Sequence, residues 1–228
     1  MIPKTIHQIF WDFSGENKTL NDFPIFQDCN FVVEQRSKSY GFEHKVWSYK
    51  DCEDLLKYHY PHYLQLWDDF SEPVMKCDFI RYIILYHYGG IYMDMDMYPL
   101  RDFTEFLSHT EVFATWHDDD KRLPYIALMM SEKGNPLFME IAEHSQASYY
   151  EKITIRLYQT WTGRLVFQTT GHRMVYRVLK KRNIKPWDIL RINTKDKVIE
   201  GDSPYFEDFN ASLWYTKKEQ NLYSNVSK

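Results

Sequence analysis

Residues 89–100 read Gly-Gly-Ile-Tyr-Met-Asp-Met-Asp-Met-Tyr-Pro-Leu, the most informative run of the chain. The apolar and aromatic residues between the double glycine and the proline predict a β-strand over residues 91–97, in which successive side chains point to opposite faces. One face of that strand is wholly apolar and consists of Ile91, Met93, Met95 and Met97. The other face carries Tyr92, Asp94 and Asp96, so we expect the two carboxylates to lie close together.

The pair formed by Asp94 and Asp96 indicates a metal site. Nearby like charges destabilise each other unless an opposite charge compensates them. A divalent cation that prefers oxygen ligands, Mg²⁺ or Mn²⁺, is the natural compensation. Such a cation would also contact the phosphates of a bound nucleotide and stabilise a leaving diphosphate. An isolated Asp-x-Asp pair more often faces water at the end of an exposed strand, so the neighbouring segments have to support the metal site.

The helix expected before this strand adds a second pair of charges. A Ser-Glu-Pro run ending at Pro73 is typical of a helix start, and the double glycine is typical of a helix end, so we expect a helix over residues 74–88. Asp78 and Arg81 are three residues apart on this helix and can pair. A surface ion pair would explain them, but most of the surrounding residues are apolar, which favours a functional or deliberately paired set of charges.

Strands and helices alternate along the rest of the chain. Runs rich in β-branched and aromatic residues predict strands at residues 6–11, 31–34, 44–49, 112–116 and 125–130. Start and stop signals predict helices at residues 51–58, 100–107, 136–144 and 171–182. This alternation favours an α/β fold with a mixed, mostly parallel central sheet flanked by helices. No repeat or low-complexity linker divides the sequence, so we expect a single domain over residues 1–228.

Composition and charge exclude some functions. A formal net charge of −4 over 228 residues argues against a nucleic-acid binder, which needs a basic face. No apolar run is long enough to form a transmembrane segment, and the three cysteines are widely spaced without a Cys-x-x-Cys pair. A reducing compartment fits these cysteines, so we expect a cytoplasmic protein, with association to a membrane surface left open. The aromatic content of 18% suits stacking on sugars and nucleobases, and equally an aromatic core.

Three segments in sequence order resemble a known family. Residues 2–9 read Ile-Pro-Lys-Thr-Ile-His-Gln-Ile, residues 76–86 read Lys-Cys-Asp-Phe-Ile-Arg-Tyr-Ile-Ile-Leu-Tyr, and the Gly-Gly-Ile-Tyr-Met-Asp-Met-Asp run follows them. Together they resemble the DXD-containing glycosyltransferase family 32, which includes mannosyltransferases, galactosyltransferases and bacterial capsular polysaccharide transferases. The pattern is also similar to the catalytic domain of the clostridial glucosylating toxins. The resemblance covers the first half of the chain.

The resemblance implies a GT-A fold, a nucleotide-diphosphate sugar donor, dependence on Mn²⁺ or Mg²⁺, and transfer with retention at the anomeric carbon. A UDP-sugar is favoured as the donor, and a GDP-sugar stays open. The residues that match the family's functional positions are Asp94 and Asp96 for the metal and diphosphate, Asp78 and Arg81 for the donor sugar, Tyr92 before the motif, and Phe10 or Trp11 for the nucleobase.

The C-terminal part departs from the family pattern. Many members place a histidine and then a tryptophan near the C-terminus to complete the metal site, whereas this chain reads Asn-Ala-Ser-Leu-Trp at residues 210–214. Trp214 matches the tryptophan, and the resemblance implies that Asn210 or Ser212 supplies an oxygen ligand in place of the histidine.

The resulting hypothesis is a metal-dependent, retaining hexosyltransferase of polysaccharide biosynthesis that acts on a hydroxyl of a glycan or glycolipid acceptor. Two alternatives come from other classes. A metal-dependent phosphoesterase also uses clustered carboxylates. A non-catalytic carbohydrate-binding protein would use the aromatic residues alone. Neither alternative requires a charged helix pair ahead of the metal strand, which favours the transferase.

Overall fold

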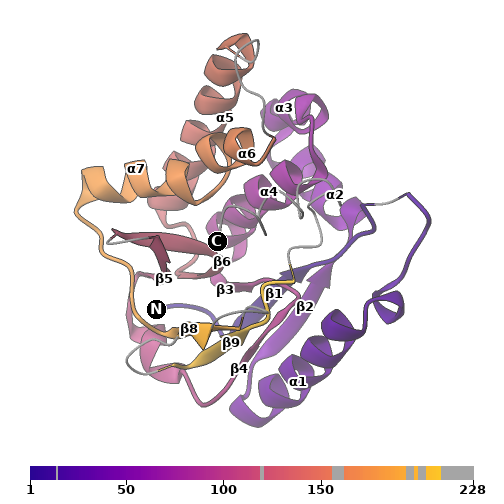
Figure 1. Ribbon diagram of the computed structural model, residues 1–228, viewed down its shortest axis with the longest axis vertical. Coiled ribbons are helices and arrows are strands. Elements are labelled where there is room, and N and C mark those ends of the chain that lie inside the picture. The colour runs from indigo at the N-terminus through magenta and orange to yellow at the C-terminus, as the bar shows by residue number, and fades with distance from the viewer. Residues whose placement is uncertain (14, 119–120, 156–161, 194–197, 200–203, 212–228) are drawn as a thin grey trace.

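The computed structural model describes residues 1–211 apart from residues 14, 119–120, 156–161, 194–197 and 200–203 (Figure 1). A five-stranded sheet forms the centre, in the order β2 (Glu43–Trp47), β1 (Thr5–Ile9), β3 (Gly90–Met93), β6 (Lys121–Ser131) and β5 (Glu111–Asp118). Strand β1 is parallel to β2 and to β3, whereas β6 is antiparallel to both of its neighbours. Four of the five strands therefore point in one direction, which confirms the predicted mixed, mostly parallel sheet of an α/β fold.

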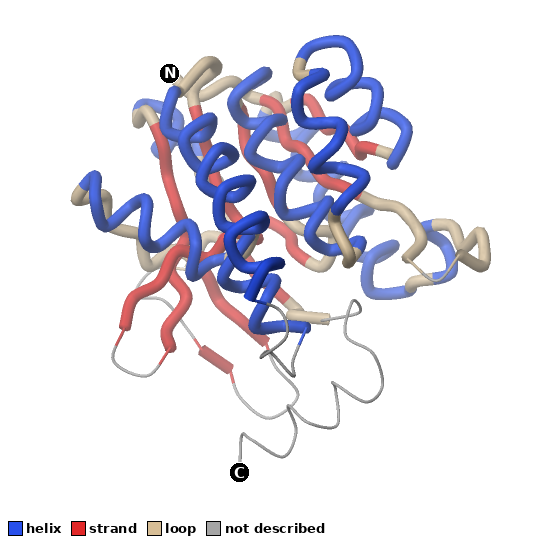
Figure 2. Tube along the Cα trace, turned by 90° about the horizontal axis from the view of Figure 1, so that it is seen from above, coloured by secondary structure: helices blue, strands red, loops and turns tan. Residues whose placement is uncertain are grey.

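Helices pack on both faces of this sheet (Figures 1 and 2). One face is covered by α2 (Tyr49–His59), α3 (Leu64–Asp69), α4 (Pro73–Tyr88), α5 (Pro136–Ile155), α6 (Thr162–Thr169) and α7 (His172–Arg182). The other face is covered by α1 (Pro24–Tyr40) and by a second sheet. Strand β3 separates the two cores, since Tyr92 packs with the helices whereas Ile91 and Met93 pack on the opposite side.

The second sheet has four short strands in the order β4 (Met97–Pro99), β9 (Phe206–Asp208), β7 (Leu190–Asn193) and β8 (Val198–Ile199). Strand β4 follows β3 closely along the chain, but it pairs with β9 and not with the central sheet. The chain therefore changes sheets between Met93 and Met97, and the residues that make this change are the Asp-x-Asp segment.

Two predicted strands are wrong. The strand predicted over residues 91–97 is interrupted at Asp94–Asp96 by a turn, in which the Met97 amide donates to the Asp94 carbonyl oxygen at 3.2 Å. The strand predicted at residues 31–34 lies inside helix α1, because its buried side chains recur at the helical spacing of Cys29, Val33 and Ser37. The local β-branched pair at residues 32–33 gave the strand signal, and helical packing against the sheet overrides it.

The predicted helix before the motif is confirmed as α4. Pro73 occupies its first turn, and the backbone amide of Gly89 closes its last turn on the Leu85 carbonyl at 2.9 Å. Most of its side chains are buried, including those of Asp78 and Arg81. Among the described residues, no helix is both long and apolar enough to cross a membrane.

Candidate functional site

The candidate site lies where the chain passes from the central sheet to the second sheet. Parallel strands of α/β sheets commonly present ligand sites at their carboxyl ends, and Asp94 directly follows the carboxyl end of β3. The Asp94 amide donates to the Ala127 carbonyl oxygen on β6 at 2.9 Å. The register of β6 against β5 shifts between Phe113 and Ala114, so the residues of β6 around Ala127 leave the ladder with β5. The backbone carbonyl groups of these β6 residues are therefore not paired with β5 and can accept hydrogen bonds from residues of the site.

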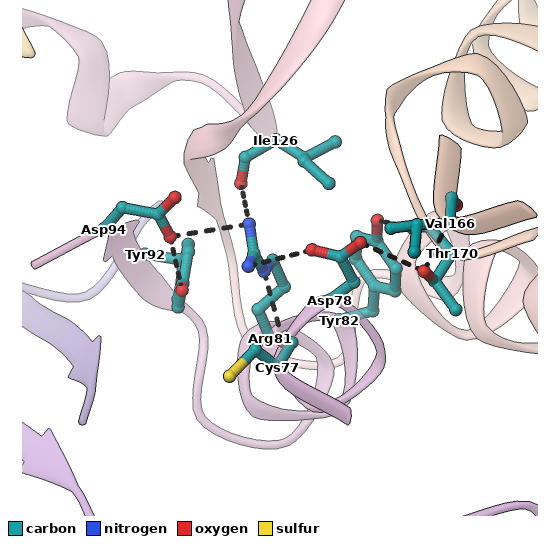
Figure 3. Close-up of polar contacts among 9 residues, drawn as sticks. All are labelled: Cys77, Asp78, Arg81, Tyr82, Tyr92, Asp94, Ile126, Val166 and Thr170. Carbon is teal, nitrogen blue, oxygen red and sulfur yellow. Dashed lines mark hydrogen bonds and ion pairs between the residues drawn. The ribbon is translucent and has the colours of Figure 1, made fainter. Parts of the chain in front are cut away.

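Arg81 joins the two predicted acidic positions (Figure 3). Its Nη2 lies 3.0 Å from Asp78 Oδ1, and its Nη1 lies 3.5 Å from Asp94 Oδ1. The guanidinium also donates to the carbonyl oxygens of Ile126 at 3.0 Å and of Cys77 at 3.1 Å. The side chains of Arg81 and Asp78 are 5% and 6% exposed, whereas that of Asp94 is 33% exposed. Asp94 is thus the most exposed member of this network.

Tyr92 holds the same carboxylate from the other side. Its hydroxyl donates to Asp94 Oδ1 at 2.7 Å, and the Arg81 guanidinium carbon lies 4.6 Å from the centre of its ring. Burial raises the pKa of the Tyr92 hydroxyl well above its ordinary value, so this group remains a hydrogen-bond donor at neutral pH. The structure therefore brings Asp78, Arg81, Tyr92 and Asp94 together, as the sequence predicts.

Thr170 is a partner that the sequence analysis missed. Its hydroxyl donates to Asp78 Oδ2 at 3.0 Å, and its carbonyl accepts from the Tyr82 hydroxyl at 2.5 Å (Figure 3). Both oxygens of Asp78 are therefore engaged, one by Arg81 and one by Thr170. Burial raises the pKa of Asp78 to about 6, and the Arg81 charge and the Thr170 hydrogen bond oppose this rise. No periodicity marks Thr170, which lies 92 residues beyond Asp78 in the chain.

Asp208 is the second residue that the sequence analysis missed. It ends β9, is 1% exposed, and accepts the Asn210 amide on Oδ1 at 2.6 Å. The Tyr125 hydroxyl donates to the same carboxylate, whose buried Oδ2 has no hydrogen-bond partner by geometry among the described residues. The loop after it is bonded to Asp96, because the Phe209 amide donates to the Asp96 carbonyl at 3.1 Å and the Ala211 amide to Asp96 Oδ2 at 2.7 Å.

The carboxylates of Asp94, Asp96 and Asp208 offer oxygen ligands of the kind that a divalent cation prefers. Burial and then the charge of Asp94 raise the pKa of Asp96 to about 6. Burial and then the charge of Asp96 raise the pKa of Asp208 well above its ordinary value. A cation would compensate these mutually unfavourable charges and would pair with the unbonded Oδ2 of Asp208. The described residues contain no ready-made group of three or more metal-binding side chains, so a cation would complete its shell with water or phosphate oxygens.

Phe10 and Trp11 follow β1 and are both half-buried. The Phe10 ring packs edge-on against Phe23 at 5.8 Å and Phe26 at 6.2 Å between ring centres. Trp11 packs against other partners, Tyr49 at 5.5 Å and Trp67 at 6.1 Å. The two candidates for the nucleobase contact therefore belong to separate aromatic groups.

The remaining predicted site residues lie at the end of the described chain. Asn210 adopts a left-handed backbone conformation, with a φ of 46°, between the two residues whose amides hold Asp96. Ser212 and Trp214 lie outside the described residues. The structure thus brings the Asn210 loop to Asp96, and the ligand roles of Asn210 and Ser212 stay predictions.

Comparisons with known proteins agree with this geometry. Residues 18–113 match the family model described as a glycosyltransferase sugar-binding region containing a DXD motif. An uncharacterized glycosyltransferase of Acanthamoeba polyphaga mimivirus is 35% identical over 140 residues, which make up 60% of this chain and 53% of the relative. A mannosyl phosphorylinositol ceramide synthase of Saccharomyces cerevisiae is 26% identical over 177 residues, which make up 72% of this chain and 39% of the relative. The chain therefore spans about half of the first relative and less of the second.

A solved structure supports the fold. The PaToxG glycosyltransferase aligns with a TM-score of 0.53 at 13% identity, covering 79% of this chain and 70% of that chain. At such low identity the likeness concerns the fold alone. The sequence matches confirm the resemblance to DXD-containing glycosyltransferases that the motifs predict, and the structural likeness supports the fold.

Proposed function

We propose that this chain, which carries a DXD-containing glycosyltransferase region, moves a hexose from a nucleotide-diphosphate sugar to a hydroxyl of a glycan or glycolipid, with retention at the anomeric carbon. A UDP-sugar is the favoured donor, and a GDP-sugar is the alternative that the word mannosyl in the name of the Saccharomyces cerevisiae relative supports. The observation that carries the proposal is the buried Arg81, which links the inner Asp78 to the partly exposed Asp94. This linkage supports a donor-sugar contact at Asp78 next to a diphosphate contact at Asp94.

Asp94, Asp96 and Asp208 would hold the metal, for which Mn²⁺ or Mg²⁺ is the expected ion. When bound, the cation would supply positive charge that stabilises the departing diphosphate. Tyr92 and Arg81 fix the orientation of the Asp94 carboxylate by a hydrogen bond and an ion pair. The carboxylate is thus preorganised before a ligand arrives, which lowers the free energy needed to orient it during the reaction.

Asp78 would orient the donor sugar and not attack it. One of its oxygens is bound to Arg81 and the other to Thr170, so neither is free to act as a nucleophile. This arrangement favours a front-side substitution. The bond between the anomeric carbon and the diphosphate oxygen breaks, the acceptor oxygen bonds to that carbon from the same face, and the acceptor proton passes to the leaving phosphate.

A thermal-shift panel with UDP, GDP and their hexose conjugates, each with Mn²⁺ or EDTA, tests the proposal. A ligand that binds only the folded protein raises the melting temperature. We expect a Mn²⁺-dependent rise with UDP conjugates, and sugar transfer to an acceptor under the same conditions. Hydrolysis of a phosphodiester without nucleotide-sugar binding would instead indicate a phosphoesterase, and glycan binding without metal or nucleotide would indicate a carbohydrate-binding protein.

Asp94→Asn should remove the Mn²⁺-dependent shift and lower transfer by about a hundredfold or more, because it removes charge at the proposed diphosphate contact. Asp54→Asn is the matched control, since Asp54 is 34% exposed and pairs with Lys50 at 2.8 Å within helix α2. The Asp54→Asn control should keep both the Mn²⁺-dependent thermal shift and the sugar transfer. Full transfer by the Asp94 variant would contradict the proposed site.

A further inference from the structure

Gln8 connects strand β1 to the turn that carries Asp94. Its side chain is fully buried, and its Nε2 donates to the Asp94 carbonyl oxygen at 3.0 Å. The backbone pairing of β1 with β3 reaches only from Ile6 to His7, which faces Tyr92. The Gln8 side chain therefore continues the attachment at the point where β3 leaves β1.

His44 on β2 fixes the orientation of the Gln8 amide. The Gln8 Oε1 lies 2.8 Å from His44 Nε2. Because the Asp94 carbonyl can only accept a hydrogen bond, the amide nitrogen of Gln8 must face it and the amide oxygen must face His44. His44 therefore carries a hydrogen on Nε2 and donates it to Gln8. This chain of two hydrogen bonds crosses three adjacent strands and ends on the backbone of Asp94.

We propose that Gln8, oriented by His44, is a positioning residue that sets where the Asp94 carboxylate meets the metal and the diphosphate. The inference rests on the proposed function of Asp94. The Asp94 carbonyl also accepts from the Met97 amide at 3.2 Å, which shapes the turn itself. The Gln8 bond differs because it ties the turn to the central sheet.

A buried amide at this place is better explained by positioning than by packing. Burying a polar group costs free energy unless its hydrogen bonds are satisfied, and an apolar side chain would fill the same space in β1 without that cost. Groups behind metal ligands are known to orient the ligands and to tune the affinity for the metal. Gln8 occupies such a place behind Asp94, with both ends of its amide bonded.

The test is the Mn²⁺ concentration that gives half-maximal UDP binding by the whole chain, measured well below the melting temperature. Gln8→Leu should raise this concentration by about tenfold, and excess Mn²⁺ should restore UDP binding. Asn135→Leu is the matched control. It also removes a buried, hydrogen-bonded amide, which donates to Glu111 at 2.9 Å and to the Thr110 carbonyl at 3.4 Å and accepts from the Leu137 amide at 3.0 Å. This amide lies near the amino end of β3, whereas Asp94 follows its carboxyl end. The control should lower the melting temperature without changing the Mn²⁺ requirement.

A double-mutant cycle with His44→Phe separates positioning from general destabilisation. If His44 acts through Gln8, the single substitution His44→Phe raises the Mn²⁺ concentration needed for half-maximal UDP binding. In the Gln8→Leu background the same substitution causes no further rise. An unchanged Mn²⁺ requirement in Gln8→Leu, or equal and additive effects of the two substitutions, would overturn the inference. Absence of Mn²⁺-dependent UDP and GDP binding by the wild-type chain would instead overturn the proposed function.

Discussion

Several charged residues of the site are buried. Arg81 is 5% exposed and is neutralised by Asp78 and Asp94, so removal of either carboxylate changes the balance of a buried charge. Breaking a buried ion pair by removing one partner commonly costs about 3–5 kcal/mol of folding free energy. Substitutions at Arg81 or Asp78 would therefore mix loss of function with loss of fold. The partly exposed Asp94 gives a cleaner test of function.

His7 is the residue whose protonation should control acid stability. Its Nε2 bonds to the Gly89 carbonyl at 3.0 Å, so its Nδ1, which accepts from Trp47 at 3.2 Å, is unprotonated. Burial lowers the pKa of His7 from 6.5 to about 4. Between these values the unfolded chain binds more protons at His7 than the folded chain, so stability contributed by His7 falls as pH falls from 6.5 towards 4.

We expect this effect to reach roughly 3 kcal/mol and to be absent in His7→Gln. Urea unfolding of both proteins from pH 7 to pH 4 measures it. Asp78 and Asp96, whose pKa values are raised to about 6, act in the opposite sense in both proteins, so the difference between the two curves isolates His7. Parallel curves for the two proteins would show that His7 does not control the pH dependence.

At the scale of elements, helix α4 and strand β3 form one unit joined by two glycines. Helix α4 supplies Asp78 and Arg81, and β3 leads directly into Asp94. Gly90 is the first residue of β3 and has a φ of 97°. A Cβ atom there would lie 2.5 Å from the Thr5 carbonyl oxygen and 3.1 Å from His7 Nε2. The glycine thus permits the close approach of β3 to β1 that places the motif.

Gly90→Ala should destabilise the fold by several kcal/mol, because backbone strain and a backbone clash add together. Gly41→Ala is the matched control. Gly41 also has a positive φ, of 70°, but a Cβ there would meet nothing within 4 Å, so the expected cost is only about 1–2 kcal/mol. Denaturant unfolding compares the two variants. Equal destabilisation would show that β3 can move away from β1 without penalty.

At the scale of the whole molecule, two sheets must come together to build the acidic site. Asp94 follows the central sheet, whereas Asp208 ends a strand of the second sheet. The Ala211 amide reaches Asp96 across 115 positions of the chain. The folded protein thereby holds the buried carboxylate of Asp208 near the partly buried carboxylate of Asp96, and this arrangement opposes stability in the absence of a cation.

Asp208→Asn should therefore raise the melting temperature of the metal-free protein by a few degrees, because one of two interacting negative charges is lost. The same substitution should weaken Mn²⁺-dependent nucleotide binding by about tenfold or more. Asp102→Asn is the control, since Asp102 is exposed and also accepts a backbone amide, that of Thr104 at 2.9 Å. A lower melting temperature together with unchanged metal dependence would place Asp208 in a structural role.

The sequence by itself determined the parts of the site that depend on short spacings. The ends of α4 follow from Pro73 and Gly89, and the contact of Asp78 with Arg81 follows from their i, i+3 spacing on that helix. Alternation along β3 correctly separated Tyr92 from Ile91 and Met93. These signals are local, so a short stretch of sequence contains them completely.

The single domain over residues 1–228 stays a prediction.

Only the tertiary structure decided the partners that come from distant segments. The interruption of the strand at Asp94, the bond from Gln8, and the approach of Thr170 and Asp208 all depend on the path of the whole chain. A threonine directly after a helix, or an aspartate at the end of a short strand, has no periodic pattern from which its partner can be predicted. Burial makes such contacts matter, because an unpaired polar group costs far more inside the protein than in water. These residues therefore take their places in the site only through the tertiary fold.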